Sequence, residues 1–191
     1  MALHLRRLDP GVFTVDGVFS PQECQALIHR AETLGFAPAS VKTRVGPQML
    51  TDVRNNDRVN LSDAELAREM ESRILPVLPI LDGQQAIGVD VRLRFYRYEA
   101  GQQFKSHRDG IVTDEQGRAS KLSYLVYLNE DFVGGETAFA EVDQETTHVV
   151  TPRTGMALLF RHRRRHEGRL LTAGEKYVLR TDVFYAPPEE A

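Results

Sequence analysis

The pattern of apolar and polar positions changes near residue 89, and each side of that point predicts a different kind of structure. Before it, apolar residues recur at spacings of three and four, which is typical of amphipathic helices. After it, they alternate with polar residues, which is typical of strands with one buried face. We therefore expect α+β organisation, with helices in the front of the chain and a β structure behind them.

Two helices are predicted in the front part. Ser20 and Glu23 have the spacing of a capping box and Gly35 closes the pattern, so the first helix lies between them. Its apolar stripe is Cys24, Leu27, Ile28, Ala31 and Leu34. Ser62 and Glu65 repeat the capping-box spacing before a second stripe, formed by Leu66, Met70, Ile74 and Val77. The polar segment between the helices, residues 41–59, is assigned no element.

Six runs after residue 89 predict strands: 89–98, 121–129, 136–140, 147–152, 155–162 and 176–185. The first and last runs each have one face with unusual polar content, formed by Arg94, Tyr96, Tyr98, Lys176, Arg180 and Asp182. Polar side chains inside a barrel need partners, because burying a lone polar group costs about 1–3 kcal/mol. We therefore expect a double-layered barrel around a functional cavity. The opposite face of the last run can pack against the helices with Tyr177, Leu179, Val183 and Tyr185.

Composition adds limits to this picture. A chain of 191 residues with 41% hydrophobic residues is long enough for one domain, which we expect to span 1–191 with a helical support region at about 1–80 and a β core at about 89–186. The net charge of −3 gives no general attraction to nucleic acid or to a membrane. One cysteine, Cys24, forms no internal disulfide, and no apolar run approaches the length of a membrane span. We expect a cytoplasmic protein.

His107 and Asp109 lie two residues apart, just after a predicted strand and turn, where the mouth of a barrel would be. In extended chain, alternate side chains point to the same face. Two histidines and one carboxylate on one face are the ligand set of redox-active metals that bind oxygen. A metal site here therefore requires a second histidine.

His166 is the best candidate for that ligand. His162 and His166 both follow the strand predicted at 155–162, but only His166 has a cation, Lys176, ten residues after it, whereas Thr172 stands ten residues after His162. A cation near a three-ligand metal can bind the far carboxylate of a diacid that chelates the metal. The other histidines are expected in a terminus, on a solvated helix face and in a strand: His4, His29 and His148.

Several motifs together resemble the iron(II)- and 2-oxoglutarate-dependent dioxygenases, specifically their prolyl 4-hydroxylase-like branch. They are H-x-D at 107–109, YLNEDFVGGETAF at 127–139, HEG at 166–168 and GEKYVLRTDVFY at 174–185, with DGVFSPQECQALI at 16–28 in front. The resemblance implies a distorted double-stranded β-helix, a jelly-roll or cupin-like barrel with N-terminal helices packed on one sheet. It also implies iron(II) bound by His107, Asp109 and His166, with 2-oxoglutarate held by Lys176.

The resemblance implies further contacts to the cosubstrate. Tyr98 stands where that branch has a cosubstrate-binding tyrosine, and Tyr127 is a second expected contact. For Arg180 two roles stay open: it shares the carboxylate of 2-oxoglutarate with Lys176, or it pairs with Asp182.

The segment after the first helix closes over the active site in the same branch. On that ground Arg54, Asn56 and Arg58 are candidate substrate contacts, and the alternative is a polar loop without a role. Asp109 argues against halogenation, because halogenases of this superfamily carry a small residue there. The run of arginines at 161–165 suggests either a phosphate-binding patch or a solvated strand end, and the acidic balance of the chain favours the second.

The activity that the resemblance implies is hydroxylation of an unactivated C–H bond with O2 and 2-oxoglutarate, releasing succinate and CO2, with ascorbate as a candidate reductant. A prolyl residue in a peptide or protein is the first substrate considered, and a free amino acid or other small molecule is the alternative. A nucleic-acid demethylase lacks an aromatic stacking platform in a chain without tryptophan. A non-catalytic metal-binding barrel would not need Lys176. The pattern predicts no oligomeric state.

Overall fold

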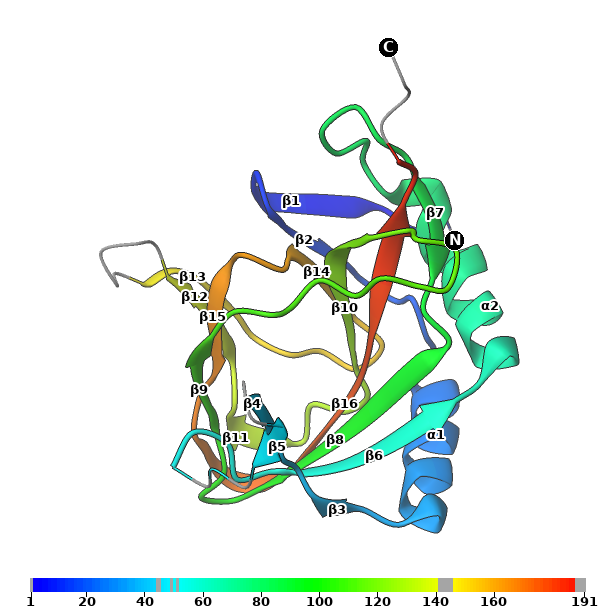
Figure 1. The fold of residues 1–191 in the computed structure, drawn as a ribbon. Coiled ribbons are helices and arrows are strands. Elements are labelled where there is room, and N and C mark those ends of the chain that lie inside the picture. Colours follow the sequence, from blue (N-terminus) through cyan, green and yellow to red (C-terminus); the bar gives the residue numbers. More distant parts are fainter. Residues whose placement is uncertain (1, 44–45, 49, 51, 141–145, 188–191) are drawn as a thin grey trace.

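The structure, a computed structural model, describes residues 2–43, 46–48, 50, 52–140 and 146–187. It is mostly β, with two α-helices, two main antiparallel sheets and one short separate hairpin (Figure 1). No helix among the described residues has the length and apolar character needed to cross a bilayer.

The elements follow each other in the order β1 (Leu5–Asp9), β2 (Val12–Val15), α1 (Pro21–Leu34), β3 (Ala37–Pro38), β4 (Val41–Thr43), β5 (Gly46–Gln48), β6 (Asp57–Ser62), α2 (Ala64–Ile74), η1 (Leu75–Val77), β7 (Ala86–Val89), β8 (Arg92–Glu99), β9 (Phe104–His107), β10 (Ser120–Tyr127), β11 (Phe132–Gly134), β12 (Thr137–Ala140), β13 (Thr146–Val150), β14 (Ala157–Arg161), β15 (Arg165–Gly168) and β16 (Leu171–Tyr185).

The larger sheet has the strand order β1-β2-β14-β10-β16-β8-β6-β3, and β7 and β11 also pair with β16. β16 is therefore its central strand. Its register with β8 sets Lys176 opposite Tyr98 and Arg180 opposite Arg94. This confirms that the polar faces of the first and last predicted strands share one surface.

The smaller sheet has the order β13-β12-β15-β9 and faces the larger one (Figure 1). In its register, His166 on β15 lies opposite His107 on β9 and, on the other side, opposite Phe139 on β12. Two short strands thus bring together histidines that are far apart along the chain.

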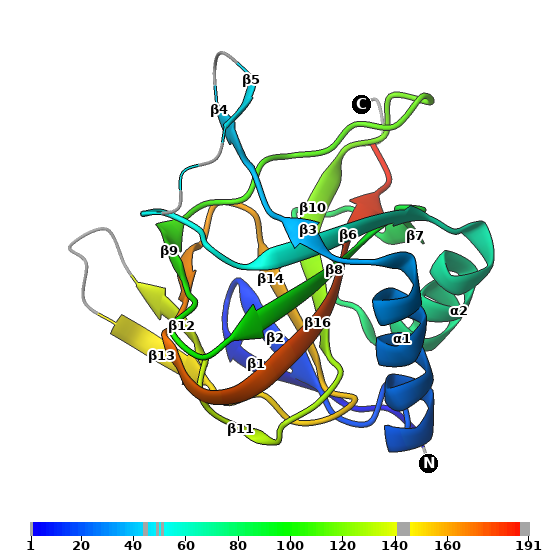
Figure 2. The ribbon, with the colours of Figure 1, turned by 90° about the horizontal axis from the view of Figure 1, so that it is seen from below.

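The two helices lie side by side next to β6, β7 and β8 (Figure 2). Their buried residues join one apolar core with the outward face of the larger sheet, in which Met70 and Leu179 are both fully buried. The predicted packing of Tyr177, Leu179, Val183 and Tyr185 against the helices is confirmed by their membership of this core. The first helix also has the predicted capping box at Ser20 and ends at Gly35, which adopts a positive φ of 84°.

The predicted cap of the second helix is wrong by one residue. Ser62 is the last residue of β6, where it pairs with Arg92, and Asp63 is the N-cap. The Asp63 carboxylate accepts hydrogen bonds from the backbone N–H groups of Glu65 and Leu66, each at 2.9 Å. Aspartate caps a helix as well as serine does, so the ladder between β6 and β8 decides which of the two residues remains in the strand.

The front of the chain is also less helical than predicted. β1 and β2 precede α1 and extend the larger sheet. The segment that had no assigned element contains β4 and β5, and β6 begins at its end. All four residues of β2 are buried, so its sequence shows no alternation from which a strand could be recognised. In β6 the alternation of Arg58, Val59 and Asn60 is present but short.

Candidate metal centre

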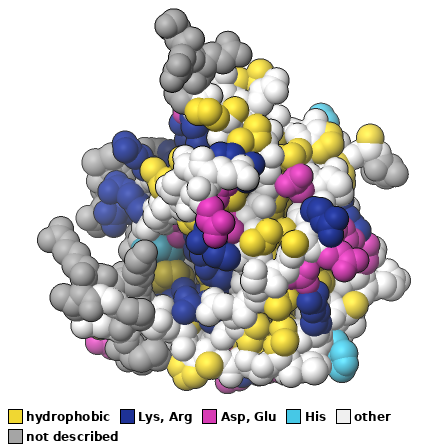
Figure 3. Space-filling view, turned by 45° about the vertical axis from the view of Figure 1, so that its right-hand side comes forward, with side chains coloured by type: hydrophobic (Ala, Val, Ile, Leu, Met, Phe, Trp, Pro, Cys, Tyr) yellow, Lys and Arg dark blue, Asp and Glu magenta, His cyan; other side chains and the backbone are white. Residues whose placement is uncertain are grey.

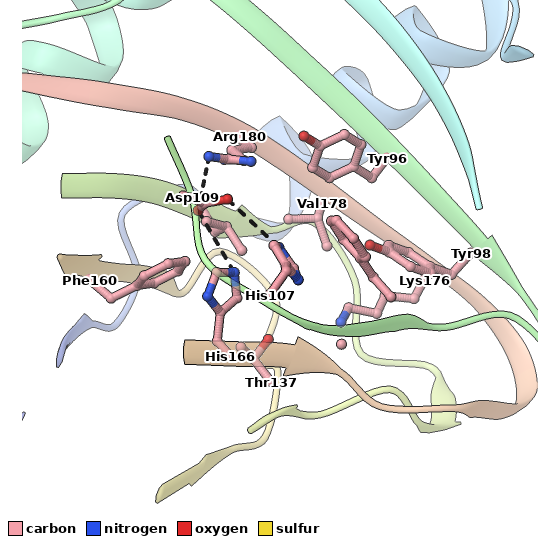
Figure 4. A pocket seen from close by; sticks show the side chains of 13 residues that line it. Tyr96, Tyr98, His107, Asp109, Thr137, Phe160, His166, Lys176, Val178 and Arg180 are labelled. Atoms are coloured by element: carbon pink, nitrogen blue, oxygen red, sulfur yellow. Dashed lines mark ion pairs between the residues drawn. The ribbon is translucent and has the colours of Figure 1, made fainter. Parts of the chain in front are cut away.

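A pocket lies between the two sheets, and both sheets contribute to its wall (Figure 4). The larger sheet supplies Tyr96, Tyr98, Leu125, Lys176, Val178, Arg180 and Phe160, and the smaller sheet supplies Phe104, His107, Thr137, His166 and Gly168. Asp109, two residues beyond β9, completes the lining.

His107, Asp109 and His166 form the group of potential metal ligands that the sequence predicts. One ligand atom from each side chain lies within 4.8 Å of the others. Nε2 of His107 is 3.7 Å from Oδ1 of Asp109, and Nε2 of His166 is 3.7 Å from Oδ2 of the same carboxylate. Among the described residues this is the only group of three or more such side chains. His162 is not part of it, which agrees with the choice of His166.

Backbone contacts orient both imidazoles. Nδ1 of His107 lies 2.8 Å from the carbonyl oxygen of Lys105, and Nδ1 of His166 lies 3.0 Å from that of Arg164. Because a carbonyl can only accept, each Nδ1 carries the proton and each Nε2 keeps its lone pair for a metal. Burial lowers the pKa of His107 to about 3, and it also lowers the pKa of His166. Both rings are therefore neutral near pH 7, as metal ligands must be.

The third ligand, Asp109, is held by two side chains of the larger sheet. Its Oδ2 accepts a hydrogen bond from the Ser123 hydroxyl at 2.5 Å and lies 2.9 Å from Nη2 of Arg180. Burial by itself would raise the pKa of Asp109, but the charge of Arg180 leads the effects that hold this pKa well below its usual range. Asp109 is therefore an ionised ligand.

Lys176 is a buried cation with no carboxylate partner among the described residues. Only 4% of it is exposed, and its Nζ donates to the carbonyl oxygen of Gly135 at 2.5 Å. The same Nζ lies 5.4 Å and 5.3 Å from the ring centres of Tyr98 and Tyr127. Burial lowers the pKa of Lys176 to about 7, since nothing nearby neutralises its charge fully. A carboxylate at this position fits the site, because it would supply the missing partner.

The two tyrosines predicted to contact the cosubstrate are placed differently. Tyr98 lines the pocket directly. Tyr127 is fully buried, and its hydroxyl is 2.7 Å from Oγ1 of Thr137, which does line the pocket. Both contacts remain predictions.

Arg180 does pair with Asp182, which is one of the two roles predicted for it. Asp182 is not its closest contact, however. Its Nη2 lies 3.6 Å from Oδ1 of Asp182 and 2.9 Å from Oδ2 of Asp109. The pairing of Arg180 with Asp109 was not predictable from the sequence, because Asp109 lies in a loop outside the strand pattern.

Arg54, Asn56 and Arg58 come close to the pocket in different ways. The Arg54 guanidinium lies over the Tyr96 ring at 4.4 Å and over the Phe104 ring at 4.5 Å. Its Nε donates to Oδ1 of Asn56 at 2.6 Å, so Asn56 holds Arg54 in place. Arg58 lies directly opposite Tyr96 in the pairing of β6 with β8.

His162 has a role that the sequence did not indicate. It is only 3% exposed, and its ring nitrogens lie 2.8 Å from the Ser120 hydroxyl and 3.0 Å from the Ser123 hydroxyl. His162 therefore supports Ser123 behind Asp109, instead of lying at a solvated strand end. The sequence contained no signal for this, because Ser120 and Ser123 have the odd spacing of opposite strand faces, and the register of β10 with β16 shifts between Ser120 and Leu122.

Comparison with known proteins agrees with this geometry. Residues 93–181 match the family described as the 2OG-Fe(II) oxygenase superfamily. No curated protein matches the chain in sequence.

Solved structures match in fold. A Pseudomonas putida prolyl-4-hydroxylase has a TM-score of 0.67 at 18% identity, covering 91% of this chain and 92% of its own. A prolyl hydroxylase from Trichoplax adhaerens, in complex with a hypoxia inducible factor oxygen degradation domain peptide fragment, has a TM-score of 0.70 at 17% identity, covering 91% and 83%. The viral collagen prolyl hydroxylase of Paramecium Bursaria Chlorella virus-1 has a TM-score of 0.58 at 21% identity, covering 91% and 95%. At these identities the likeness shows the fold alone.

Proposed function

We propose that this chain, whose residues 93–181 match the 2OG-Fe(II) oxygenase superfamily, is an enzyme of that superfamily that hydroxylates unactivated C–H bonds on a distorted double-stranded β-helix. The observation that carries the proposal is the group of His107, Asp109 and His166 with the buried, unpaired Lys176 in the same pocket.

When bound, iron(II), 2-oxoglutarate and O2 supply the oxidising chemistry, with release of succinate and CO2. The chain would hold the metal through Nε2 of His107, an oxygen of Asp109 and Nε2 of His166. Lys176 would bind the far carboxylate of 2-oxoglutarate, with Tyr98 and Tyr127 as neighbouring contacts. Ascorbate is proposed as a reductant that keeps the metal ferrous.

The chain's own residues prepare the pocket for this chemistry. Ser123 and Arg180 fix one oxygen of Asp109, which orients the carboxylate before any metal arrives. The rings of Phe104 and Phe160 lie against the two imidazoles, with centroid distances of 3.6 Å to His107 and 4.3 Å to His166. These rings exclude water from the ligands.

A prolyl residue in a peptide is the first proposed substrate, supported by the solved prolyl hydroxylases that share the fold. A free amino acid or another small acid is the second. It is favoured by Arg54 and Arg58, neither of which has a carboxylate partner in the described part of the chain. A nucleic-acid substrate is not proposed, since basic and acidic side chains form separate small groups on the face shown in Figure 3.

The metal and cosubstrate assignment is tested in the absence of oxygen. Protein with iron(II) and 2-oxoglutarate should show the weak visible charge-transfer band of a chelated keto acid. His166→Ala should abolish the band, because it removes a ligand, whereas His29→Ala on the exposed face of α1 should keep it. His162→Ala removes only the support of Ser123 and should weaken the band without abolishing it. Folding of all three variants is checked by circular dichroism. A band that survives in His166→Ala and disappears in His162→Ala would refute the ligand assignment. Succinate release over peptides and free amino acids then tests the substrate.

A further inference from the structure

Four arginine side chains gather around Tyr96, which lines the pocket, and of the four Arg180 is itself a lining residue while Arg54, Arg58 and Arg94 lie behind the lining. Arg54 lies over the Tyr96 ring, and Arg58 lies opposite Tyr96 on the neighbouring strand. Arg94 stands two residues before Tyr96 and therefore on the same face of β8, opposite Arg180 on β16. Arg180 is four residues from Lys176, about 13 Å along the strand, so this group is separate from the proposed cosubstrate anchor.

Carboxylates compensate the positive charge of only two of these four arginines. Nη1 of Arg94 lies 3.2 Å from Asp182, and Arg180 lies between Asp109 and Asp182. Those two carboxylates thus serve two arginines, and one of them is also a proposed metal ligand.

Arg54 and Arg58 contact only neutral partners within the described residues. Arg54 donates to the side-chain oxygen of Asn56, and its Nη2 is buried with no hydrogen-bond acceptor at all. Arg58 contacts the Ser40 hydroxyl at 3.5 Å. Arg54 is only 4% exposed, so bulk water has little access to its guanidinium. Burying an unpaired charge is costly, which indicates that an anion binds here when the protein works.

The electrostatic surroundings agree with that reading. Burial by itself would raise the pKa of Tyr96, but the charges of Arg180, Arg54 and Arg94 lower it below the usual value. The pKa of Arg58 is lowered by burial and by repulsion from the other three arginines. A surplus of positive charge therefore surrounds Tyr96, which itself lines the pocket.

Stacking on aromatic rings explains the position of Arg54 only in part. Contact with the Tyr96 and Phe104 rings accounts for the plane of the guanidinium, but it gives Nη2 no acceptor. The same stack continues to the metal centre, because Phe104 lies on His107 with nearly parallel rings, 16° apart. The ring of Phe104 therefore lies between the Arg54 guanidinium and the proposed metal ligand His107.

We propose that Arg54 and Arg58 bind the carboxylate of the organic substrate, which favours the second substrate class proposed above, a small carboxylic acid, over an internal residue of a neutral peptide. This inference rests on the proposed function, because it assigns the substrate class of the same pocket.

The test uses pairs of ligands that differ only in this charge. A panel of aliphatic acids, aromatic acids and N-acetylated amino acids is compared with the corresponding primary amides, and acidic peptides are included. Binding is measured by the shift of the thermal unfolding midpoint of protein loaded with iron(II) and 2-oxoglutarate without oxygen, and succinate release is then measured in air. Arg54→Gln and Arg58→Gln are compared with Arg68→Gln, which makes the same change on the exposed face of α2.

At least one acid should bind tenfold or more tightly than its amide, and the preference should fall at least tenfold in Arg54→Gln and Arg58→Gln. Arg68→Gln should keep it, and the affinity for 2-oxoglutarate should stay within twofold in all three. Without ligand, the Arg54→Gln protein should unfold at no lower temperature than the wild type. If Arg54 had only a structural role, the variant would unfold at a lower temperature.

The inference is overturned if no acid binds more tightly than its amide, or if Arg54→Gln weakens the binding of acids and amides equally. It is also overturned if acidic peptides are the only ligands whose acid group increases the affinity. Repeating the comparison on metal-free protein and on Lys176→Ala separates this result from the proposed function. Absence of the visible band would refute the iron and 2-oxoglutarate assignment, while an acid preference that survives in Lys176→Ala would still support the arginine site.

Discussion

At the scale of single residues, Asp109 is the side chain on which the polar contacts of the pocket converge. Ser123 and Arg180 both bind its Oδ2, and His162 supports Ser123 from behind. The oxygen on the other side, Oδ1, faces His107. This arrangement fixes which oxygen is engaged by the protein and leaves the other for the metal, at the expense of part of the negative charge on Asp109.

Ser123→Ala should weaken metal binding without abolishing it. The substitution removes one of the two contacts that orient Asp109, and loss of such a supporting hydrogen bond typically costs about 10–100-fold in metal affinity. Calorimetric titration with Ni(II) or Co(II) measures this without turnover. Ser72→Ala, which removes a hydroxyl bonded only to a helix carbonyl, is the control and should bind metal like the wild type. Equal affinity in Ser123→Ala would show that Arg180 alone orients Asp109.

The sequence predicted the ligands better than their support. The spacing between His166 and Lys176 was sufficient to choose His166 over His162, and in the structure it is His166 that lies with His107 and Asp109. The contacts of Ser123 and His162 were not predictable, because they depend on which strands become neighbours. The pattern of residues along one strand does not show which other strand will lie beside it.

At the scale of elements, strands were predicted where alternation was long enough to see. β8, β10 and β16 each extend over eight residues or more and were recognised, and the shorter β12, β13 and β14 were recognised from their apolar residues. β9 and β15, which carry the two histidine ligands, have the sequences FKSH and RHEG, so they are short and mostly polar and look like loop. The elements most important for the metal centre are thus the least visible in the sequence.

Gly155 connects the larger sheet to the helical layer and should tolerate no side chain. Its φ is 77°, its carbonyl accepts from the N–H of Val18 at 2.9 Å, and an added Cβ would lie 1.9 Å from the carbonyl oxygen of Phe19. Gly155→Ala should therefore lower the free energy of unfolding by about 3 kcal/mol, from backbone strain and overpacking together. Urea denaturation measures the loss.

Gly17→Ala is the matched control for this substitution. Gly17 has a similar φ of 66°, but an added Cβ would meet nothing within 4 Å. Only the cost of the left-handed backbone should remain, about 1–2 kcal/mol. Equal losses of unfolding free energy in Gly155→Ala and Gly17→Ala would show that the structure relieves the contact with Phe19 without cost.

At the scale of the whole molecule, a chain with a net charge of −3 encloses a pocket in which cations outnumber carboxylates. Composition could not reveal this, because the acidic residues that set the net charge lie mostly outside the pocket. Electrostatic attraction of an acid is therefore local, and it depends on the fold that brings β6, β8 and β16 together.

The stabilisation of the protein by 2-oxoglutarate should decrease as pH rises above 7. Burial sets the pKa of Lys176 at about 7 in the ligand-free protein, so above that pH the lysine must take up a proton when it binds a carboxylate. The affinity for 2-oxoglutarate should then fall by up to tenfold per pH unit, equivalent to about 1.4 kcal/mol. Thermal unfolding of Ni(II)-loaded protein at fixed 2-oxoglutarate, between about pH 7 and 9, measures the trend. Lys176→Arg keeps its charge and should show no such slope.

Without 2-oxoglutarate the same lysine has the opposite effect. Between its native pKa of about 7 and the ordinary value of 10.5, the unfolded chain binds a proton that native Lys176 does not. The contribution of Lys176 to stability therefore rises with pH in that window. A Lys176→Arg variant with the same pH dependence as the wild type, with or without 2-oxoglutarate, would refute this account.

The two histidine ligands belong to the smaller sheet, while Lys176 and the arginines at 58, 94 and 180 belong to the larger one. The histidine ligands and the groups that select the substrate can thus change independently over evolution, with the exception of Arg180, which also holds Asp109. A library of substitutions confined to the pocket-facing positions of β6 and β8 would leave the histidine framework intact while exploring new acids. The same separation makes the chain a suitable starting point for designing biocatalysts with altered substrate scope.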